Sequence, residues 1–446
     1  MTVNNERLEY LQILRSLGGD PAGKQAAVKY VEDSDCYIYG RPAPFAFVPA
    51  FYTAGELEFM RSIVTTTHRI LGKVIRQYVA DAEYRKLFHF PADVERLVLL
   101  PCNYEEPLPI ARFDFFLNEE DRSFKFCEFN ADGAAAMSRT QIGCEAVEQS
   151  DTFREFARRH KVRSFEYFDT WASEFLKTYH SDKNAEENPN VLITDFADAV
   201  TMSDITRYLK SFEKLGVYAR FVDIRKLAFD GEHLTDPADG TAFHAVYRRA
   251  VTSDIAKHVS ECQALIDAVA AEKAVIVGHF RTTVVHSKMI GVALLDEQTK
   301  AFLTEDEWLF VQNHILPTYR FRSDNPAISV EEIARDKDAW ILKPEDDYDS
   351  HGVFAGKDHT PEEWEKLTRD YLDRGYVAMV FFTPCKAETA LPYSNDGDCG
   401  IVDWYSMTGT FSFNGTHYGF FNRMGAEGVI SESHGGVSIP AYEVLS

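Results

Sequence analysis

Two aromatic-rich segments near the end of the first quarter of the chain carry polar side chains at alternate positions. The first, residues 112–117, reads R-F-D-F-F-L, and the second, residues 124–130, reads F-K-F-C-E-F-N. The polar run between them, residues 118–123, consists of residues that favour turns. Alternation on both sides of such a run predicts a β-hairpin.

The chemistry of this hairpin depends on its register. A hairpin folded symmetrically about Asp121 pairs Phe116 with Phe126, Asp114 with Glu128, and Arg112 with Asn130. Alternate residues of a strand share a face, so four polar side chains should lie together: Arg112, Asp114, Glu128 and Asn130. Two facing carboxylates repel and need a counter-charge, either Arg112 or a hard cation such as Mg²⁺. The spacing also suits a solvated surface hairpin, and by itself leaves both interpretations open.

Three further cations lie in apolar surroundings later in the chain. Lys288 stands in V-V-H-S-K-M-I, Lys343 in I-L-K-P, and Arg423 in F-F-N-R-M-G. Taken singly, each could be a surface side chain whose stem packs on the protein. We expect both lysines to stand in strands, and an ammonium inside an apolar strand needs an anionic partner. Together with the hairpin they supply the cations and oxygen ligands that a nucleoside triphosphate with magnesium requires.

Composition restricts the possible partners. The chain has 446 residues, with 70 acidic against 47 basic side chains and a net charge of −23, which disfavours nucleic acid. It contains no apolar run of about 18 residues and no signal-peptide pattern at its start, so we expect a cytoplasmic protein without a membrane partner. Its seven cysteines are scattered without a C-x-x-C pair, which suits a reducing compartment and argues against structural zinc.

The middle of the chain, residues 188–285, alternates short apolar strands with helices. The expected strands are 191–195, 217–223, 243–249 and 274–278, and the expected helices are 203–215, which begins Ser-Asp as a plausible cap, and 258–272. Alternation at this spacing predicts βαβ units and a parallel sheet. We therefore expect a Rossmann-like domain here.

The flanking parts, residues 1–187 and 286–446, differ from this pattern and from each other. In the first we expect helices at 1–30, 55–88 and 134–180, and a short strand at 96–101. In the last we expect strands at 340–344, 352–356 and 376–384, a helix at 360–373 that begins Thr-Pro-Glu-Glu, and a β-meander at 401–419. The fold class is therefore mixed, α+β with an α/β part.

The motifs in their order resemble the circularly permuted branch of the ATP-grasp superfamily, which includes the glutathionylspermidine synthetase domain. They are Arg112-Phe-Asp114, Glu128-Phe-Asn130, Ser287-Lys288, Lys343-Pro344 and Arg423. Ordinary ATP-grasp chains reach the nucleotide lysines first and the acidic metal motif last, whereas this chain has the reverse order. The resemblance spans roughly residues 90–446. It implies a circularly permuted ATP-grasp fold with a Rossmann-like pre-ATP-grasp domain, and no amidase domain.

The resemblance also implies an activity, an ATP-dependent carboxylate–amine ligase that works through an acyl-phosphate, with ATP and Mg²⁺ as cofactors. The metal ligands would be Asp114, Glu128 and Asn130; Arg112 and Arg423 would be catalytic; Lys288, Lys343 and Phe382, at the adenine hinge, would bind ATP. The acid would be a peptide or amino acid, and the amine could be a polyamine. The sequence leaves the two substrates and the oligomeric state open.

The chain departs from the family in the loop after Lys343-Pro344. Residues 345–352 read E-D-D-Y-D-S-H-G, where the family has more glycine and an arginine that His351 could replace. This departure keeps open a nucleotide-binding relative without turnover. A hydrolase that uses Asp114 and Glu128 as acid and base also stays open, although it gives the lysines no role. The acidic segments 346–349 and 395–398 would suit a polycationic amine or simply an acidic surface.

Overall fold

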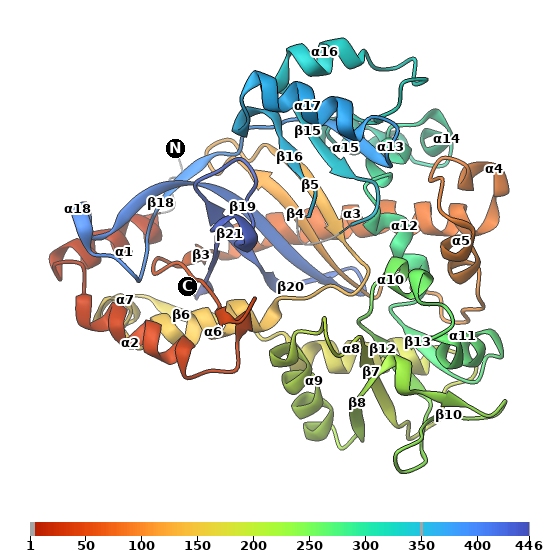
Figure 1. Ribbon diagram of the computed structural model, residues 1–446. Coiled ribbons are helices and arrows are strands. Elements are labelled where there is room, and N and C mark those ends of the chain that lie inside the picture. The colour runs from red at the N-terminus through yellow and green to blue at the C-terminus, as the bar shows by residue number, and fades with distance from the viewer. Residues whose placement is uncertain (1–4, 348–350, 446) are drawn as a thin grey trace.

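Six β-sheets with helices packed around them make up the described part of the chain, residues 5–347 and 351–445 of the computed structural model (Figure 1). The fold is mixed α/β, as predicted. Two of the sheets matter most for function, because they form opposite walls of one cavity.

The predicted hairpin lies inside the largest sheet. It consists of β4 (Ile110–Leu117) and β5 (Phe124–Asn130), and the sheet continues with the order β22-β21-β19-β4-β5. The other strands are β18 (Lys386–Ala390), β19 (Ile401–Phe413), β20 (Thr416–Phe420), β21 (Asn422–Gly425) and β22 (Val437–Ile439). Strands β19 and β20 confirm the meander predicted for 401–419.

The register of the hairpin is as predicted at its functional end. Arg112 faces Asn130 and Asp114 faces Glu128, but Phe116 faces Lys125 rather than Phe126. The difference arises from a β-bulge after Asp114, where Cys127 is the extra residue of β5. Beyond the bulge, every pair is shifted by one residue.

Because side chains alternate along each strand, the two faces of the hairpin carry different kinds of residue. Its phenylalanines pack on the long helix α3 (Ala54–Ala80), and the buried rings are Phe113, Phe115, Phe124, Phe126 and Phe129. Helix α3 begins at Thr53 with a capping box to Glu56. The opposite face of the hairpin carries the four polar residues.

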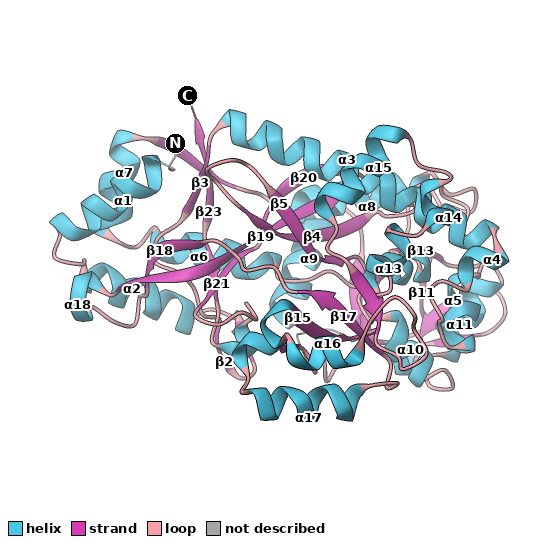
Figure 2. Ribbon diagram, turned by 90° about the horizontal axis from the view of Figure 1, so that it is seen from above, coloured by secondary structure: helices cyan, strands magenta, loops and turns pink. Residues whose placement is uncertain are grey.

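A second sheet forms the other wall of the cavity (Figure 2). It is antiparallel, in the order β14 (Thr318–Arg320), β17 (Tyr376–Val380), β15 (Trp340–Pro344) and β16 (Phe354–Ala355). Leu342 and Ala378 face the helices α16 (Val330–Arg335) and α17 (Pro361–Tyr371). The alternate residues Ile341 and Lys343 face the cavity. The predicted strand 340–344 is confirmed, and so is the predicted helix, with Thr360 as its cap.

The third sheet confirms the predicted parallel arrangement of residues 188–285. Its order is β13 (Val275–Val277), β12 (Ala245–Arg248), β7 (Val191–Asp195) and β8 (Ala219–Asp223), with every pair parallel. Helices α8 (Phe168–His180) and α9 (Met202–Lys214) cover one face, and α11 (Gln263–Ala270) covers the other. The Ser-Asp cap predicted for α9 is wrong. Asp204 instead accepts hydrogen bonds at 3.0 Å from the backbone nitrogens of Ala136 and Ser138.

Helices dominate the first part of the chain. They are α1 (Asn5–Ser16), α2 (Pro21–Glu32), α4 (Ala82–Arg85), α5 (Ala92–Val98), α6 (Met137–Val147) and α7 (Asp151–Arg159). The strand predicted for 96–101 is wrong, because residues 92–98 are helical and bury Val94, Leu97 and Val98 at helical spacing. The helix predicted for 134–180 is interrupted by β6 (Lys161–Ser164), which joins β23 (Ala441–Leu445) and β3 (Ala50–Tyr52) in a sheet.

The remaining elements are short. They are β1 (Tyr37–Ile38), β2 (Arg41–Pro42), β9 (Ala228–Phe229), β10 (Leu234–Asp236), β11 (Thr241–Phe243), α10 (Thr252–Lys257), α12 (Thr283–His286), α13 (Ile290–Leu294), α14 (Glu297–Lys300), α15 (Glu305–His314) and α18 (Asp396–Cys399). Across the described residues, none of the helices has the length and apolar character needed to cross a membrane.

Candidate functional site

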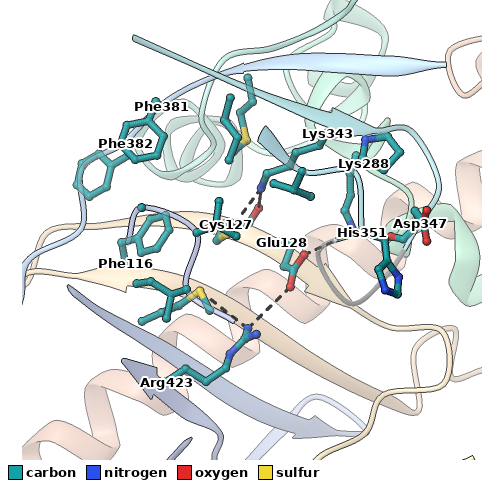
Figure 3. A pocket seen from close by; sticks show the side chains of 18 of the residues that line it. Phe116, Cys127, Glu128, Lys288, Lys343, Asp347, His351, Phe381, Phe382 and Arg423 are labelled. Atoms are coloured by element: carbon teal, nitrogen blue, oxygen red, sulfur yellow. Dashed lines mark hydrogen bonds and ion pairs between the residues drawn. The ribbon is translucent and has the colours of Figure 1, made fainter. Parts of the chain in front are cut away.

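The cavity between the two sheets encloses about 750 Å³, part of it open to solvent. One end is apolar and is lined by Phe116, Ile341, Met379, Phe381, Phe382 and Met407. The other end is charged and is lined by Glu128, Lys288, Lys343 and Arg423 (Figure 3). A ligand with a flat apolar group and a polyanionic tail would match both ends.

The cavity brings together most of the residues predicted from the sequence. Six of them line it: Glu128, Asn130, Lys288, Lys343, Phe382 and Arg423. The other two, Arg112 and Asp114, lie behind this lining and are connected to it by hydrogen bonds. The site therefore has a set of charges that lines the cavity and a buried pair behind them that supports them.

Asp114 is the centre of the buried part. It is fully buried, and Arg112 donates to both of its oxygens at 2.7 and 2.8 Å. Arg423 donates to Oδ2 at 2.6 Å, and Asn130 donates to the same oxygen at 3.0 Å. Gly409 of β19 lies opposite Asp114, and a Cβ there would approach Oδ1 to 2.8 Å. Asp114 thus holds two arginines from different strands in place.

Glu128 is the carboxylate that faces the cavity. It accepts a hydrogen bond from Asn130 at 3.2 Å and lies 3.5 Å from the Lys288 ammonium and 3.9 Å from the Arg423 guanidinium. Burial works against its ionisation, but Lys288, Lys343 and Arg423 outweigh burial and hold the pKa of Glu128 well below its usual range. Glu128 is therefore ionised at neutral pH.

The two lysines reach the charged end of the cavity from different elements (Figure 3). Lys343, on β15, is 5% exposed and donates from Nζ to the Cys127 carbonyl at 3.3 Å. Lys288 lies in the turn between α12 and α13, so the expectation that it stands in a strand is wrong. Its Nζ donates to the Asp347 carbonyl at 3.2 Å, and its backbone nitrogen donates to the Glu345 carbonyl at 2.8 Å. Both ammonium groups thus lie where an anion would enter.

The expected magnesium ligands are only partly free to bind a metal. Among the described residues, no group of three or more His, Cys, Asp or Glu side chains is arranged around a common metal position. Glu128 and Asn130 face the cavity and offer the oxygen donors that Mg²⁺ prefers. Asp114 is held by Arg112 and Arg423 instead. The pair Glu128 and Asn130 therefore fits a magnesium ion better than the predicted set of three.

Phe382, which the sequence places at an adenine hinge, lines the apolar end of the cavity. Phe382 stacks on Phe116 of β4, with ring centroids 5.9 Å apart and planes at 16°. The backbone nitrogen of Phe381 is already bonded to the Ala339 carbonyl at 2.7 Å. The hinge therefore offers aromatic surface from both walls.

The two acidic segments lie in different places. Residues 348–350 of the acidic loop fall outside the described residues, while Asp347 and His351 line the cavity. Burial raises the pKa of the neighbouring Asp346 to about 6. Segment 395–398 lies against α1 and α2, where Asp398 pairs with Arg15 at 2.8 Å, and it does not line the cavity. Its proposed attraction for a polyamine is therefore not part of this site.

An aromatic residue that the sequence did not single out organises the arginines. The Phe421 ring has three guanidinium carbons near it, those of Arg112 at 4.8 Å, Arg423 at 5.2 Å and Arg139 at 5.7 Å from its centroid. Arg139 comes from α6 and forms a buried ion pair with Glu432. The F-F-N-R run gives a weak local signal for Phe421, but Arg139 has none.

Comparison with known proteins gives a result at the level of fold. No protein-family model matches the chain, and no curated protein matches its sequence. Among solved structures, it is similar to a glutathione synthetase-like effector from Globodera pallida in its apoform, with a TM-score of 0.59 and 11% identity over 95% of this chain and 96% of that one. The two proteins therefore share a fold over nearly their whole lengths.

Two further solved structures were matched at lower similarity. A putative gamma-glutamylcysteine synthetase from Methylobacillus flagellatus has a TM-score of 0.39 and 9% identity over 88% of this chain and 89% of that one. A D-cycloserine synthetase has a TM-score of 0.27 and 16% identity over 43% of this chain and 59% of that one.

Proposed function

We propose that this protein is an ATP-dependent carboxylate–amine ligase of the ATP-grasp type, which forms an amide through an acyl-phosphate. The observation that carries the proposal is the cavity between two sheets, apolar at one end and lined at the other by Lys288, Lys343, Arg423 and Glu128. These parts suit a purine base and its phosphates. The fold shared with a glutathione synthetase-like effector supports it.

Residues at different positions in the cavity would bind different parts of ATP. The base would lie in the apolar end, against Phe116 and Phe382, and the phosphates would meet Lys343 and Lys288. Glu128 and Asn130 would hold a magnesium ion, which supplies charge neutralisation at the phosphates. Lys343 also ties the two walls together through the Cys127 carbonyl.

The reaction then needs positioning and charge stabilisation rather than a protein nucleophile. A carboxylate oxygen of the acid attacks the γ-phosphorus of ATP, ADP leaves, and an acyl-phosphate forms. The amine attacks the acyl carbon, expels phosphate and loses a proton, which leaves the amide. Arg423, supported by Arg112 through Asp114, would stabilise the negative charge that develops during transfer.

The finer predictions from the sequence belong to the same proposal. The motif order is that of a circularly permuted chain, with residues 188–285 as a Rossmann-like pre-ATP-grasp domain between residues 1–187 and 286–446. The acid would be a peptide or amino acid and the amine could be a polyamine, as in a glutathionylspermidine synthase. We place the protein in the cytoplasm.

The decisive experiment is a substrate matrix. The protein is incubated with Mg-ATP, a panel of acids that includes glutathione and amino acids, and a panel of amines that includes spermidine. We expect ADP formation that needs both substrates, and a product whose mass is the sum of acid and amine less water. Lys343→Met should abolish turnover, and Lys366→Met on the exposed face of α17 should not. ADP formation that depends on neither acid nor amine would contradict the proposal.

One observation favours a second candidate, a nucleotide-binding protein without ligase turnover. Asp114, expected to bind magnesium, is occupied by Arg112 and Arg423. Thermal stabilisation by Mg-ATP without ADP formation against the whole matrix would support this candidate. The hydrolase alternative is disfavoured, because an aspartate buried between two arginines is not available as an acid or a base.

A further inference from the structure

A long loop beside the cavity places a glutamate on the arginine cluster. Strands β21 and β22 pair directly, yet residues 426–436 connect them, whereas most hairpin connections have about 2–5 residues. Glu432 in this loop forms an ion pair with Arg139 of α6, and their side chains are 5% and 16% exposed. A connection of this length that buries a carboxylate calls for a functional explanation.

The three arginines around Phe421 are not equivalent. Arg112 and Arg423 are both paired with Asp114, a fixed residue of the central sheet. The carboxylate that pairs with Arg139 is instead supplied by the loop. Burial works against the charge of Arg112, but Asp114, Glu128 and also Glu432 raise its pKa, so the loop carboxylate also acts on Arg112.

The cluster has unused hydrogen-bonding capacity. Among the buried side-chain atoms that lack a hydrogen-bond partner in the described part of the chain, three belong to this cluster: Nε of Arg139, Nε of Arg423 and Oε1 of Glu432. Arginine is the residue that binds carboxylates through two parallel hydrogen bonds. The site is therefore built for a carboxylate, and Glu432 satisfies it incompletely.

The part of the loop that carries Glu432 forms a turn of its own. Gly436 donates from its backbone nitrogen to the Ser431 carbonyl at 2.8 Å, and the Ser431 hydroxyl lies 2.9 Å from Nδ1 of His434. Gly435 has a φ of 76°, which favours glycine. The preceding residues, Gly428 to Ile430, line the nucleotide cavity. Movement of Glu432 would thus occur beside the cavity.

We propose that Arg139, together with Arg423 across Phe421, binds a carboxylate of the acid substrate, and that Glu432 occupies this site in the free protein until the substrate displaces it. The inference rests on the proposed ligase function and deepens it. It places the acid next to the charged end of the cavity, where its carboxylate must meet the γ-phosphate. The exchange of one carboxylate for another keeps Arg139 paired in both states, so it avoids leaving a buried charge without a partner.

The test measures carboxylate binding in the absence of nucleotide. Glutarate and glutathione are titrated by calorimetry into the unmodified protein and into Glu432→Gln, Arg139→Gln and the double variant. We expect Glu432→Gln to bind at least one probe about ten-fold more tightly, because the internal competitor has lost its charge. Arg139→Gln should weaken binding about ten-fold, and the double variant should behave like Arg139→Gln. Glu427→Gln, an exposed position of the same loop, should have no effect.

The alternative is that Glu432 only fixes the loop. In that case Glu432→Gln lowers the melting temperature and leaves the affinity for both probes unchanged, which overturns the inference. An absence of binding in every variant overturns it as well. Arg139→Lys, which keeps the charge but not the paired hydrogen bonds, replaces Arg139→Gln if that variant does not fold. Binding of ADP is measured separately. If the protein does not bind ADP, but the variants change the affinity for the carboxylate probes as expected, the result counts against the ligase proposal alone.

Discussion

Asp114 shows how burial changes the role of a residue from the one that its sequence motif predicts. The sequence predicts a magnesium ligand, whereas in the structure the Asp114 side chain is fully buried and hydrogen-bonded to Arg112 and Arg423. Its spacing from Arg112 predicted the first contact. The second joins residues 309 positions apart, and no local pattern could predict it.

We expect Asp114→Ala to destabilise the fold as well as to abolish activity. The change leaves two buried guanidinium groups without their carboxylate, which costs about 3–5 kcal/mol. Urea unfolding followed by circular dichroism measures the free energy of unfolding. Glu120→Gln in the exposed hairpin turn serves as the control and should stay within about 0.5 kcal/mol of the unmodified protein. A stable but inactive Asp114→Ala protein would instead favour a direct catalytic or metal-binding role.

Glu128 is the better residue for testing the chemistry. It faces the cavity, and the surrounding cations hold its pKa well below the usual range, so its negative charge is present at neutral pH. Glu128→Gln removes that charge at constant size. We expect ADP formation to fall by about 100-fold or more. The melting temperature should also fall, because Lys288, Lys343 and Arg423 lose a counter-charge, so the assay is run well below the melting temperature of the variant. Full activity in this variant would remove Glu128 from the proposed site.

At the scale of elements, sequence predicted the hairpin pairs but not the bulge. Alternation of aromatic and polar residues fixes which face is buried, and it is regular on either side of Cys127. The three-residue spacing between Phe126 and Phe129 marks the insertion, but a hairpin folded symmetrically about Asp121 does not use this signal. The bulge nevertheless presents the Cys127 carbonyl to Lys343.

The Cys127 carbonyl allows a test that distinguishes the role of the backbone from the role of the side chain at this position. Deletion of Cys127 should restore a regular ladder, remove the acceptor for Lys343 and weaken ADP binding by about ten-fold, which corresponds to one lost hydrogen bond to a charged group. Cys127→Ala keeps the carbonyl and should bind ADP within about three-fold of the unmodified protein. Calorimetric titration with ADP measures both. Equal affinities for the two variants would show that the bulge plays no part in nucleotide binding.

Two wrong element predictions share a physical cause. Residues 96–101 and the segment around Lys288 are short apolar runs, which periodicity alone cannot assign to strand or helix. Contacts with residues distant in the sequence determine which structure each run adopts. Helix α5 packs on α10, and Lys288 is held in a turn by the Glu345 carbonyl.

At the scale of the whole molecule, the sequence predicted the parts better than their arrangement. The parallel order of β7, β8, β12 and β13 follows from strands that alternate with helices. The two sheets face each other across the cavity, and this arrangement depends on contacts between distant segments, such as that of Lys343 with Cys127. Arg139 and Glu432, 293 residues apart, belong to the same class of contact.

Buried histidines give the whole molecule a predictable sensitivity to acid. His417 on β20 is nine-tenths buried beside Phe420 and Phe165, and burial, with a smaller effect of Arg61, lowers its pKa to about 3. An unfolded histidine titrates near about 6.5, so between these values only the unfolded state binds this proton. Stability should therefore fall as the pH drops below about 6.5, by up to about 1.4 kcal/mol per pH unit for each such histidine.

His417→Phe keeps a ring in the aromatic cluster and should reduce the slope of unfolding free energy against pH by that amount between pH values of about 5.5 and 4. Urea unfolding at several pH values measures the slope, with the exposed His233→Phe as control. An unchanged slope in His417→Phe would mean that His417 is protonated in the folded protein.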